Sequence, residues 1–211
     1  VVFESLGRLY TMPAGGGAVR RLTDADDGME LYPSWSRDGS RIVYVRWTDS
    51  DLGQIRAVGV NGRGDRAVTT RPGHYSRPVF SPDGSTIVFE RGSGGYLTAP
   101  EYSDDPGVYR IPASGGAQTL VTRSMGDPHF GASSDRIFMT GSDGGAQQLV
   151  STDLNGEAMR VHAKGDLVTG YRVSPSGKFF AFTENYDAFA MPLMPGGQAV
   201  SISAGTKALP V

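Results

Sequence analysis

One stretch of the chain decides the fold: Tyr-Pro-Ser-Trp-Ser-Arg-Asp-Gly-Ser-Arg-Ile-Val-Tyr, at residues 32–44. It returns as Arg-Pro-Val-Phe-Ser-Pro-Asp-Gly-Ser-Thr-Ile-Val-Phe at residues 77–89, and more divergent copies occupy residues 127–139 and 171–182. In the first two copies an Asp-Gly pair separates two β-rich runs, and Gly supplies the positive φ that a chain reversal needs. Each copy is therefore predicted to be a pair of antiparallel strands.

The copies are regularly spaced along the chain. With Pro33, Pro78, Pro128 and Tyr171 taken as equivalent, the repeat returns after 45, 50 and 43 residues. A period of this length is typical of one four-stranded blade of a β-propeller. The spacing predicts an all-β chain of about five four-stranded blades, or a fragment of a six- or seven-bladed propeller.

A second pattern falls between the copies and predicts the two outer strands of each blade. It consists of two short β-rich runs joined by a turn that contains Gly. The turns are Gly15-Gly16-Gly17, Asn61-Gly62, Gly115-Gly116, Asn155-Gly156 and Gly196-Gly197. In the last blade this hairpin is expected to run from residues 189–193 to residues 199–201.

The two ends of the chain raise the question of how the ring closes. Residues 1–4 align with residues 87–90, so the first blade is predicted to lack its innermost strand. Residues 204–211 are expected either to fold back beside residues 1–4 as that strand or to begin a further blade. An unclosed ring would expose sheet edges and favour a dimer. The predicted bounds are a partial blade at 1–23 and blades at 30–70, 75–123, 126–163 and 168–203.

Composition agrees with a turn-rich β protein. The 211 residues include 30 Gly and 13 Pro, too many for a helical bundle or a coiled coil. Because the 20 basic and 22 acidic residues are nearly balanced and form no long block, we expect no nucleic-acid partner. No apolar run reaches the roughly 18 residues of a membrane span, so no membrane insertion is expected.

Residues and motifs that carry catalytic chemistry are scarce. The chain has no Cys and 3 His, and it contains no Gly-x-Ser-x-Gly, His-Glu-x-x-His or Gly-Lys-Ser/Thr motif. We therefore expect no catalytic residue, no metal and no cofactor in this segment. Any enzymatic activity would belong to a longer parent protein.

The repeat also resembles a known family. The Pro-x-Trp/Phe-Ser-x-Asp-Gly-x-x-Ile-Val-Tyr/Phe pattern, with Leu-Tyr-x-Met-Pro at 9–13 and Arg-Arg-Leu-Thr at 20–23, is similar to the WD40-like PD40 repeat of TolB-like propellers. The resemblance covers nearly the whole chain and is weakest around Pro128, where Ser133-Ser134 replace Asp-Gly. It implies a binding scaffold in the periplasm or outside the cell, with a cytoplasmic location as the alternative.

Such repeats also form the N-terminal propellers of larger hydrolases, which include amidohydrolase-like and prolyl-peptidase-like enzymes. Residues 207–211 resemble the run that leads into a further blade in the amidohydrolase-linked versions. The resemblance thus allows a second hypothesis, in which this segment is linked covalently to a catalytic domain.

One end of the propeller is the candidate functional face. Turns of an antiparallel meander alternate between the two ends of the blades, and the long loops 24–28, 71–77 and 92–107 gather at the same end. The innermost strand of each blade borders the central channel, so residues at its start are candidate binding residues. They are Tyr32, His74, Arg77, Asp127, His129, Tyr171 and Arg172.

Other interpretations compete for these residues. Tyr32, Tyr171 and Arg172 could simply pack at the channel mouth. Asp127 and His129 are two apart, so strand alternation would point them to one side, where they could form a weak divalent-metal site with His74. The preferred interpretation is that these histidines have no function. His162 is expected on the surface.

The insert at 92–107 is the last candidate. Its Tyr96, Glu101, Tyr102 and Asp104 are expected to contact a partner, since exposed tyrosines are typical of interfaces. Capping of the channel and a disordered excursion are the alternatives.

Two functions follow from these patterns. The first is a non-catalytic scaffold that binds a protein, peptide or ligand through the loop face and the channel. The second is an N-terminal accessory or gating domain of a larger amidohydrolase-like or peptidase-like hydrolase. A metal-dependent enzyme built on the channel histidines is the weakest hypothesis.

Overall fold

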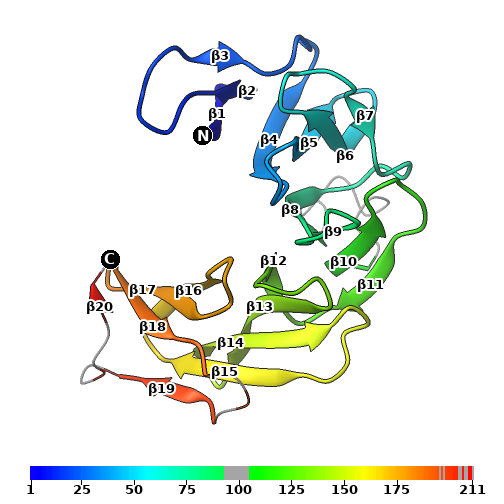
Figure 1. Ribbon diagram of the computed structural model, residues 1–211. Helices are drawn as coiled ribbons and strands as arrows, with labels where there is room; N and C mark the ends of the chain where they lie inside the picture. Colours follow the sequence, from blue (N-terminus) through cyan, green and yellow to red (C-terminus); the bar gives the residue numbers. More distant parts are fainter. Residues whose placement is uncertain (93–104, 195, 197, 204–205, 207–208, 211) are drawn as a thin grey trace.

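The computed structural model is built from five β-sheets arranged as an open arc around a common centre (Figure 1). The structure describes residues 1–92, 105–194, 196, 198–203, 206 and 209–210, and none of these residues is helical. In this part of the chain, therefore, no helix is long and apolar enough to cross a membrane. The prediction of an all-β propeller is confirmed.

Each sheet is a meander of consecutive strands. The first sheet contains β1 (Val2–Ser5), β2 (Arg8–Thr11) and β3 (Arg20–Arg21). The second contains β4 (Met29–Trp35), β5 (Arg41–Thr48), β6 (Leu52–Gly59) and β7 (Arg66–Ala67). The third contains β8 (Tyr75–Phe80), β9 (Thr86–Arg91), β10 (Gly107–Pro112) and β11 (Thr119–Thr122).

The last two sheets follow the same order with one exchange. The fourth contains β12 (Gly126–Phe130), β13 (Arg136–Asp143), β14 (Ala146–Asp153), β15 (Arg160–Gly165) and, at its outer edge, β19 (Val200–Ile202). The fifth contains β16 (Val168–Val173), β17 (Phe179–Glu184), β18 (Asp187–Pro192) and β20 (Leu209–Pro210).

The C-terminal strands do not lie where the sequence predicts. The run at 199–201 was expected to complete the fifth blade, but β19 instead pairs in parallel with β15 of the fourth. This placement buries Ile202 in the core between those two blades. Leu209–Pro210 then pairs with Phe189 and Ala190 of β18 as the fourth strand of the fifth blade, not with β1. The alternative in which the C-terminal residues close the ring beside residues 1–4 is therefore wrong.

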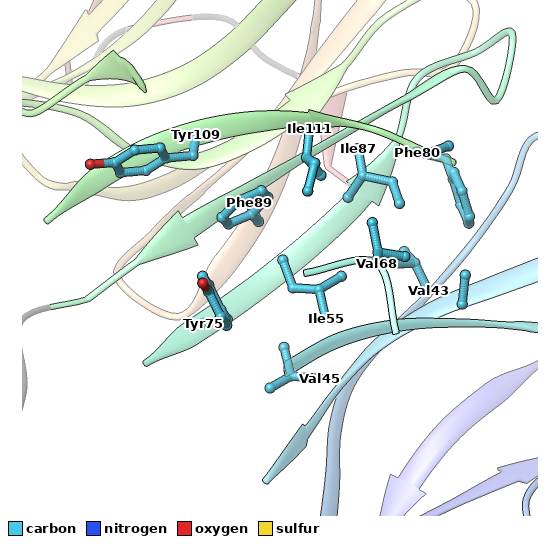
Figure 2. Close-up of a cluster of buried hydrophobic side chains, with 12 residues drawn as sticks. Val43, Val45, Ile55, Val68, Tyr75, Phe80, Ile87, Phe89, Tyr109 and Ile111 are labelled. Carbon is cyan, nitrogen blue, oxygen red and sulfur yellow. The ribbon is translucent and has the colours of Figure 1, made fainter. Parts of the chain in front are cut away.

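The core consists of apolar clusters between consecutive sheets. Ile42 and Tyr44 of β5 pack against the first sheet, whereas Val43 and Val45 pack against the third. All four side chains are buried, because a propeller blade is covered on both faces. Figure 2 shows the cluster between the second and third sheets, where Val43, Val45 and Ile55 meet side chains of β8, β9 and β10. This two-sided burial explains the continuous Ile-Val-Tyr/Phe runs of the repeat.

In the second to fifth blades, the turn after the innermost strand is held by its own side chains. The Ser36 hydroxyl donates to Asp38 Oδ1 at 2.6 Å, and the Ser40 amide donates to the same oxygen at 3.1 Å. These hydrogen bonds lower the pKa of Asp38 to about 2. In the fourth blade, where Asp-Gly is missing, Ser133 donates to Asp135 and the turn still forms.

Turn glycines connect each blade to the one before it. A Cβ at Gly62 would meet the carbonyl of Leu22, and a Cβ at Gly156 would meet the carbonyl of Val121. Both glycines have a positive φ, of 79° and 82°. The Asn-Gly turns therefore do more than reverse the chain, because they let the outer hairpins pack closely on the preceding blade.

Candidate functional site

A cavity of about 740 Å³ lies at the centre of the arc, between the innermost strands of the second to fifth blades. Aromatic and aliphatic side chains form much of its wall, and guanidinium groups and a phenol stand among them. The lining includes Tyr32, Pro33, Trp35, Arg37, Arg77, Pro78, Val79, Phe80, His129, Phe130, Arg172, Val173 and Pro175.

A repeated backbone distortion marks the start of the inner strands. Tyr32, Arg77 and Asp127 all precede a proline and have φ of 53°, 50° and 56°. In each blade the strand register shifts at this point, between Leu31 and Ser34 in the second blade and at the equivalent positions in the third and fourth. Positive φ is uncommon outside glycine, and a bulge redirects side chains. Three blades thus present a strained residue at equivalent places around the centre.

The bulge breaks the alternation that was expected to pair Asp127 with His129. The Asp127 carboxylate forms ion pairs with Arg77 and Arg172, while the His129 ring hydrogen-bonds to backbone groups. His74 lies elsewhere, with its ring 4.9 Å from that of Trp47. Among the described residues, no group of three His, Cys, Asp or Glu side chains could hold a metal ion. The metal-site hypothesis for His74, Asp127 and His129 is therefore wrong.

His129 is a buried structural residue. Its Nε2 accepts a hydrogen bond from the Val173 amide at 3.0 Å, so its Nδ1 carries the proton and donates to the Asp127 carbonyl at 3.0 Å. Burial lowers the pKa of His129 to about 4. The ring is therefore neutral at pH 7, and it joins the inner strands of the fourth and fifth blades.

Four alternating charges run along one side of the cavity. Arg77 Nη1 donates to Glu90 Oε2 at 2.9 Å, and Arg77 Nε lies 3.8 Å from Asp127 Oδ1. Arg172 Nη2 donates to the same Asp127 oxygen at 2.7 Å. About half of each arginine side chain is exposed, at 52% and 54%, whereas Glu90 and Asp127 are largely covered, at 18% and 22%. The outward side of this chain of ion pairs is therefore cationic.

Arg37 adds a third guanidinium from the opposite side. It lies in the turn between β4 and β5, and it donates to the Gly131 carbonyl at 2.6 Å and to the Pro175 carbonyl at 2.8 Å. These acceptors belong to the turns of the fourth and fifth blades. One side chain of the second blade thus reaches across the centre of the arc.

Tyr171 does not border the channel, contrary to the prediction. Its side chain is 2% exposed, packs with Phe180 and Phe182, and donates from its hydroxyl to the Gln147 carbonyl at 3.1 Å. Burial raises its pKa to about 12. The reason lies in the register: Tyr171 takes the place of the prolines in the other blades, and Gly170 takes the place of Tyr32, Arg77 and Asp127.

The prediction for His162 is also wrong. It was expected on the surface, but its ring packs 5.2 Å from that of Phe138, and its Nε2 lies 2.7 Å from the Ser151 hydroxyl. Burial lowers its pKa to about 4. The four residues of the insert, Tyr96, Glu101, Tyr102 and Asp104, lie outside the described residues.

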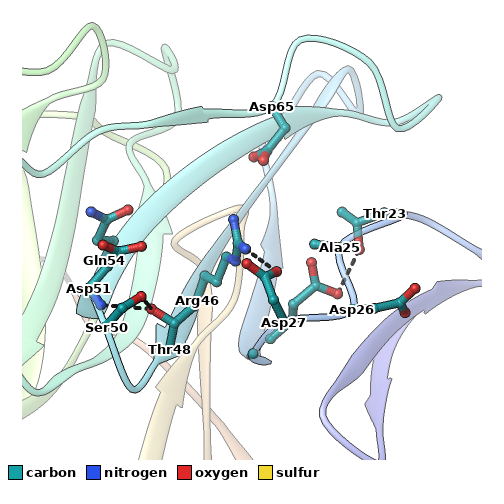
Figure 3. Close-up of polar contacts among 12 residues, drawn as sticks. Thr23, Ala25, Asp26, Asp27, Arg46, Thr48, Ser50, Asp51, Gln54 and Asp65 are labelled. Carbon is teal, nitrogen blue, oxygen red and sulfur yellow. Dashed lines mark hydrogen bonds and ion pairs between the residues drawn. The ribbon is translucent and has the colours of Figure 1, made fainter.

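On the loop face, two arginines of adjacent strands pair with the acidic loop 24–28, and Figure 3 shows one of them, Arg46, beside Asp27. Arg21 Nη2 donates to Asp26 Oδ1 at 2.7 Å, and Arg46 donates to Asp27. The ion pairs of Asp26 and Asp27 connect the loop to the first two blades, although these side chains stay 79% and 73% exposed.

Comparisons with known proteins agree with the propeller architecture. No known protein-family profile matches the chain. The chain is 33% identical over 90 residues to the Tol-Pal system protein TolB of Francisella tularensis subsp. mediasiatica (strain FSC147), covering 43% of the chain and 19% of that protein. The crystal structure of TolB from Acinetobacter baumannii superposes with a TM-score of 0.64 at 18% identity, over 87% of the chain and 45% of TolB. The fold is that of a TolB-like β-propeller.

The TolB-like fold also occurs within a longer enzyme. A puromycin-hydrolyzing peptidase of Mycobacterium tuberculosis superposes with a TM-score of 0.61 at 16% identity, over 89% of the chain and 33% of the peptidase. The 90 matched residues span about a fifth of the length of the Francisella TolB.

Sequence reasoning missed Arg37 in this TolB-like propeller. Arg37 occupies the position that Pro82 and Pro175 hold in two other copies of the repeat, Ser-x-Asp/Ser-Gly. A departure from the chain's own repeat was therefore the signal that could have found it.

Proposed function

We propose that this TolB-like propeller is a non-catalytic scaffold that holds a segment of a protein partner in its central cavity. The observation that carries the proposal is a cavity of about 740 Å³ whose wall combines Arg37, Arg77 and Arg172 with the aromatic side chains of Tyr32 and Trp35. This size lies within the range of roughly 300–1,000 Å³ that is common for ligand sites.

The chemistry of the wall favours a segment with an acidic group beside an apolar one. Arginine and aromatic side chains are the residue types that contribute most to binding energy at interfaces. Arg77 and Arg172 are each about half exposed, at 52% and 54%, so N–H groups not used by Asp127 and Glu90 can meet a carboxylate. The partly exposed side chains of Pro33, Trp35 and Val79 offer apolar surface next to them.

The relatives agree with a binding role and suggest a location. The Francisella relative is a protein of the Tol-Pal system, as its name states. On the basis of this resemblance we propose that the present chain acts in the periplasm or outside the cell, with a covalently linked domain or a separate protein as its partner. The insert residues Tyr96, Glu101, Tyr102 and Asp104 stay predicted contacts for that partner.

Selection of peptides against the purified chain tests the proposal. A displayed library of random peptides is panned on the protein, and the affinity of each selected peptide is measured by fluorescence anisotropy. We expect acidic peptides whose affinity falls at least about tenfold in Arg172→Gln and in Arg77→Gln, since each removes charge-assisted hydrogen bonds. Arg63→Gln, at an exposed turn outside the cavity, is the control. Peptides that bind all three variants equally well would contradict a central site.

A second candidate function is an accessory domain of a larger hydrolase. The observation that favours it is the peptidase in which this fold makes up a third of the chain. Sequencing the gene on both sides of this segment tests it, because an adjoining hydrolase domain is required. A stop codon directly after residue 211 in the native gene would exclude it.

The isolated segment is also a candidate for dimerisation. In the described structure, β1 pairs with β2 along one edge and with no strand along the other. Exposed edges of this kind favour pairing with another chain. Sedimentation equilibrium is expected to show a dimer, and a monomer across the micromolar range would contradict this.

A further inference from the structure

A second cavity, of about 380 Å³, lies against β9, β10 and β11 of the third blade. It shares no lining residue with the central cavity. Polar side chains dominate its wall, among them Arg91, Gln118 and Arg123, and Asp105 is the acidic residue among those described there.

Arg91 lies in this wall, and two of its three guanidinium nitrogens lack hydrogen-bond partners. The residue is 4% exposed, and its Nε and Nη2 atoms are buried without an acceptor. Its guanidinium carbon lies 5.7 Å from the centre of the Tyr109 ring, which supports the cation but accepts no conventional hydrogen bond. A guanidinium stays charged at any ordinary pH, so two buried donors without acceptors are costly.

The neighbouring polar groups do not supply the missing acceptors. The Tyr109 hydroxyl donates to the Asp105 carbonyl at 2.6 Å, and the Asp105 carboxylate pairs with Arg123 at 3.1 Å. Gln118 Nε2 donates to the Tyr75 hydroxyl at 2.7 Å, and its buried Oε1 has no partner. Arg91, Asp105, Tyr109 and Gln118 all line the same cavity of about 380 Å³, which has room for a small group.

The two Arg91 nitrogens without hydrogen-bond partners indicate the kind of ligand. Nε and Nη2 lie on the same side of the guanidinium, and together they present two parallel N–H groups. This fork matches the two oxygens of a carboxylate or of a phosphate group. Arg123, at the rim, adds a second positive charge and is 61% exposed.

We propose that this cavity is an anion site, in which Arg91 binds a carboxylate or phosphate group in bidentate fashion and Arg123 assists at the rim. The site is separate from the central cavity and goes beyond the proposed scaffold function.

Binding of two simple anions tests the proposal. Inorganic phosphate and acetate are titrated separately into the purified chain by calorimetry, at constant ionic strength maintained with sodium chloride. We expect saturable binding of at least one of them. Binding of phosphate alone assigns a phosphate group, and binding of acetate assigns a carboxylate. Saturable binding of neither anion overturns the proposal, because ordered water would then satisfy Arg91.

Two variants test whether the anion binds in this cavity. Gln118→Glu changes one atom and sets a carboxylate beside Arg91, so we expect it to abolish anion binding and to raise the melting temperature. Arg123→Gln, at an exposed position that preserves the core, is expected to weaken binding about tenfold.

Arg63→Gln, at an exposed turn outside both cavities, is the matched control and is expected to leave anion affinity unchanged. Loss of anion binding in Arg77→Gln but not in Gln118→Glu would show that the anion binds in the central cavity and would overturn the proposal. Failure of the peptide experiment above does not affect this outcome, since the two sites share no residue.

Discussion

Arg172 of the fifth blade donates a hydrogen bond of 2.7 Å to Asp127 of the fourth blade, 45 residues earlier in the sequence. The same Asp127 oxygen lies 3.8 Å from Nε of Arg77 in the third blade. One carboxylate thus connects three blades at the wall of the central cavity. Because 22% of its side chain is exposed, its ion pairs are only partly screened by solvent.

We expect Asp127→Asn to destabilise the fold by about 1 kcal/mol, because it removes the charge that holds two arginines. Asn tolerates the positive φ of this position, so the change does not add backbone strain. The free energy of unfolding is measured in urea. Asp143→Asn is the control, since its pair with Lys164 is exposed. An equal effect of both variants would show that Asp127 is an ordinary surface charge.

The turn glycines that touch the preceding blade allow a sharper stability test. Gly156→Ala is expected to cost about 3 kcal/mol or more, because a Cβ would meet the Val121 carbonyl and φ is positive. Gly144→Ala is the matched control: its φ is also positive, at 59°, but no atom lies within 4 Å of its Cβ position. Its cost is expected to be about 1 kcal/mol. If Gly156→Ala and Gly144→Ala lower the free energy of unfolding in urea by similar amounts, the contact between the blades can relax around the added methyl group.

The sequence predicts the features of this fold that local chemistry determines. The two-sided burial of residues 42–45 and the Ser-x-Asp-Gly turns follow from apolar patterning and turn preferences. The exchange of β19 into the fourth sheet does not follow, because a short strand such as 200–202 pairs with whichever edge buries Ile202. Nor does the position of Tyr171 follow, since it depends on where the inner strand carries its bulge, which lies between Val168 and Gly170 in this blade. Bulges are set by packing across the whole sheet rather than by neighbouring residues.

Arg37 connects distant blades, and we expect its loss to destabilise the fold. Arg37→Ala removes hydrogen bonds to the Gly131 and Pro175 carbonyls, at positions 94 and 138 residues away in the sequence. We expect a loss of about 1 kcal/mol in urea unfolding and faster amide exchange in the turns of the fourth and fifth blades. Arg63→Ala, at an exposed turn, is the control. Unchanged exchange in those turns would show that Arg37 binds them only weakly.

Acid should destabilise the protein through its buried histidines. His129 has a pKa of about 4 when folded, against an ordinary value near 6.5, so the unfolded chain binds more protons between these two pH values. The stability that comes from its neutral form is complete above about pH 6.5 and is lost as the pH falls towards 4. The loss approaches about 1.4 kcal/mol per pH unit for this one group. Asp38 and Asp83, whose pKa values are about 2, titrate mainly below this window.

His129→Gln separates this effect from general acid unfolding. Gln can still accept from the Val173 amide and donate to the Asp127 carbonyl, but it does not titrate. The free energy of unfolding, measured in urea from pH 7 to pH 4.5, should therefore depend less steeply on pH in the variant. His162→Gln is expected to flatten the profile by a smaller amount, because His162 is only partly buried and solvent screens its charge. If His129→Gln keeps the full slope of the unaltered chain, the acid sensitivity comes from other groups, and a buried neutral His129 is ruled out.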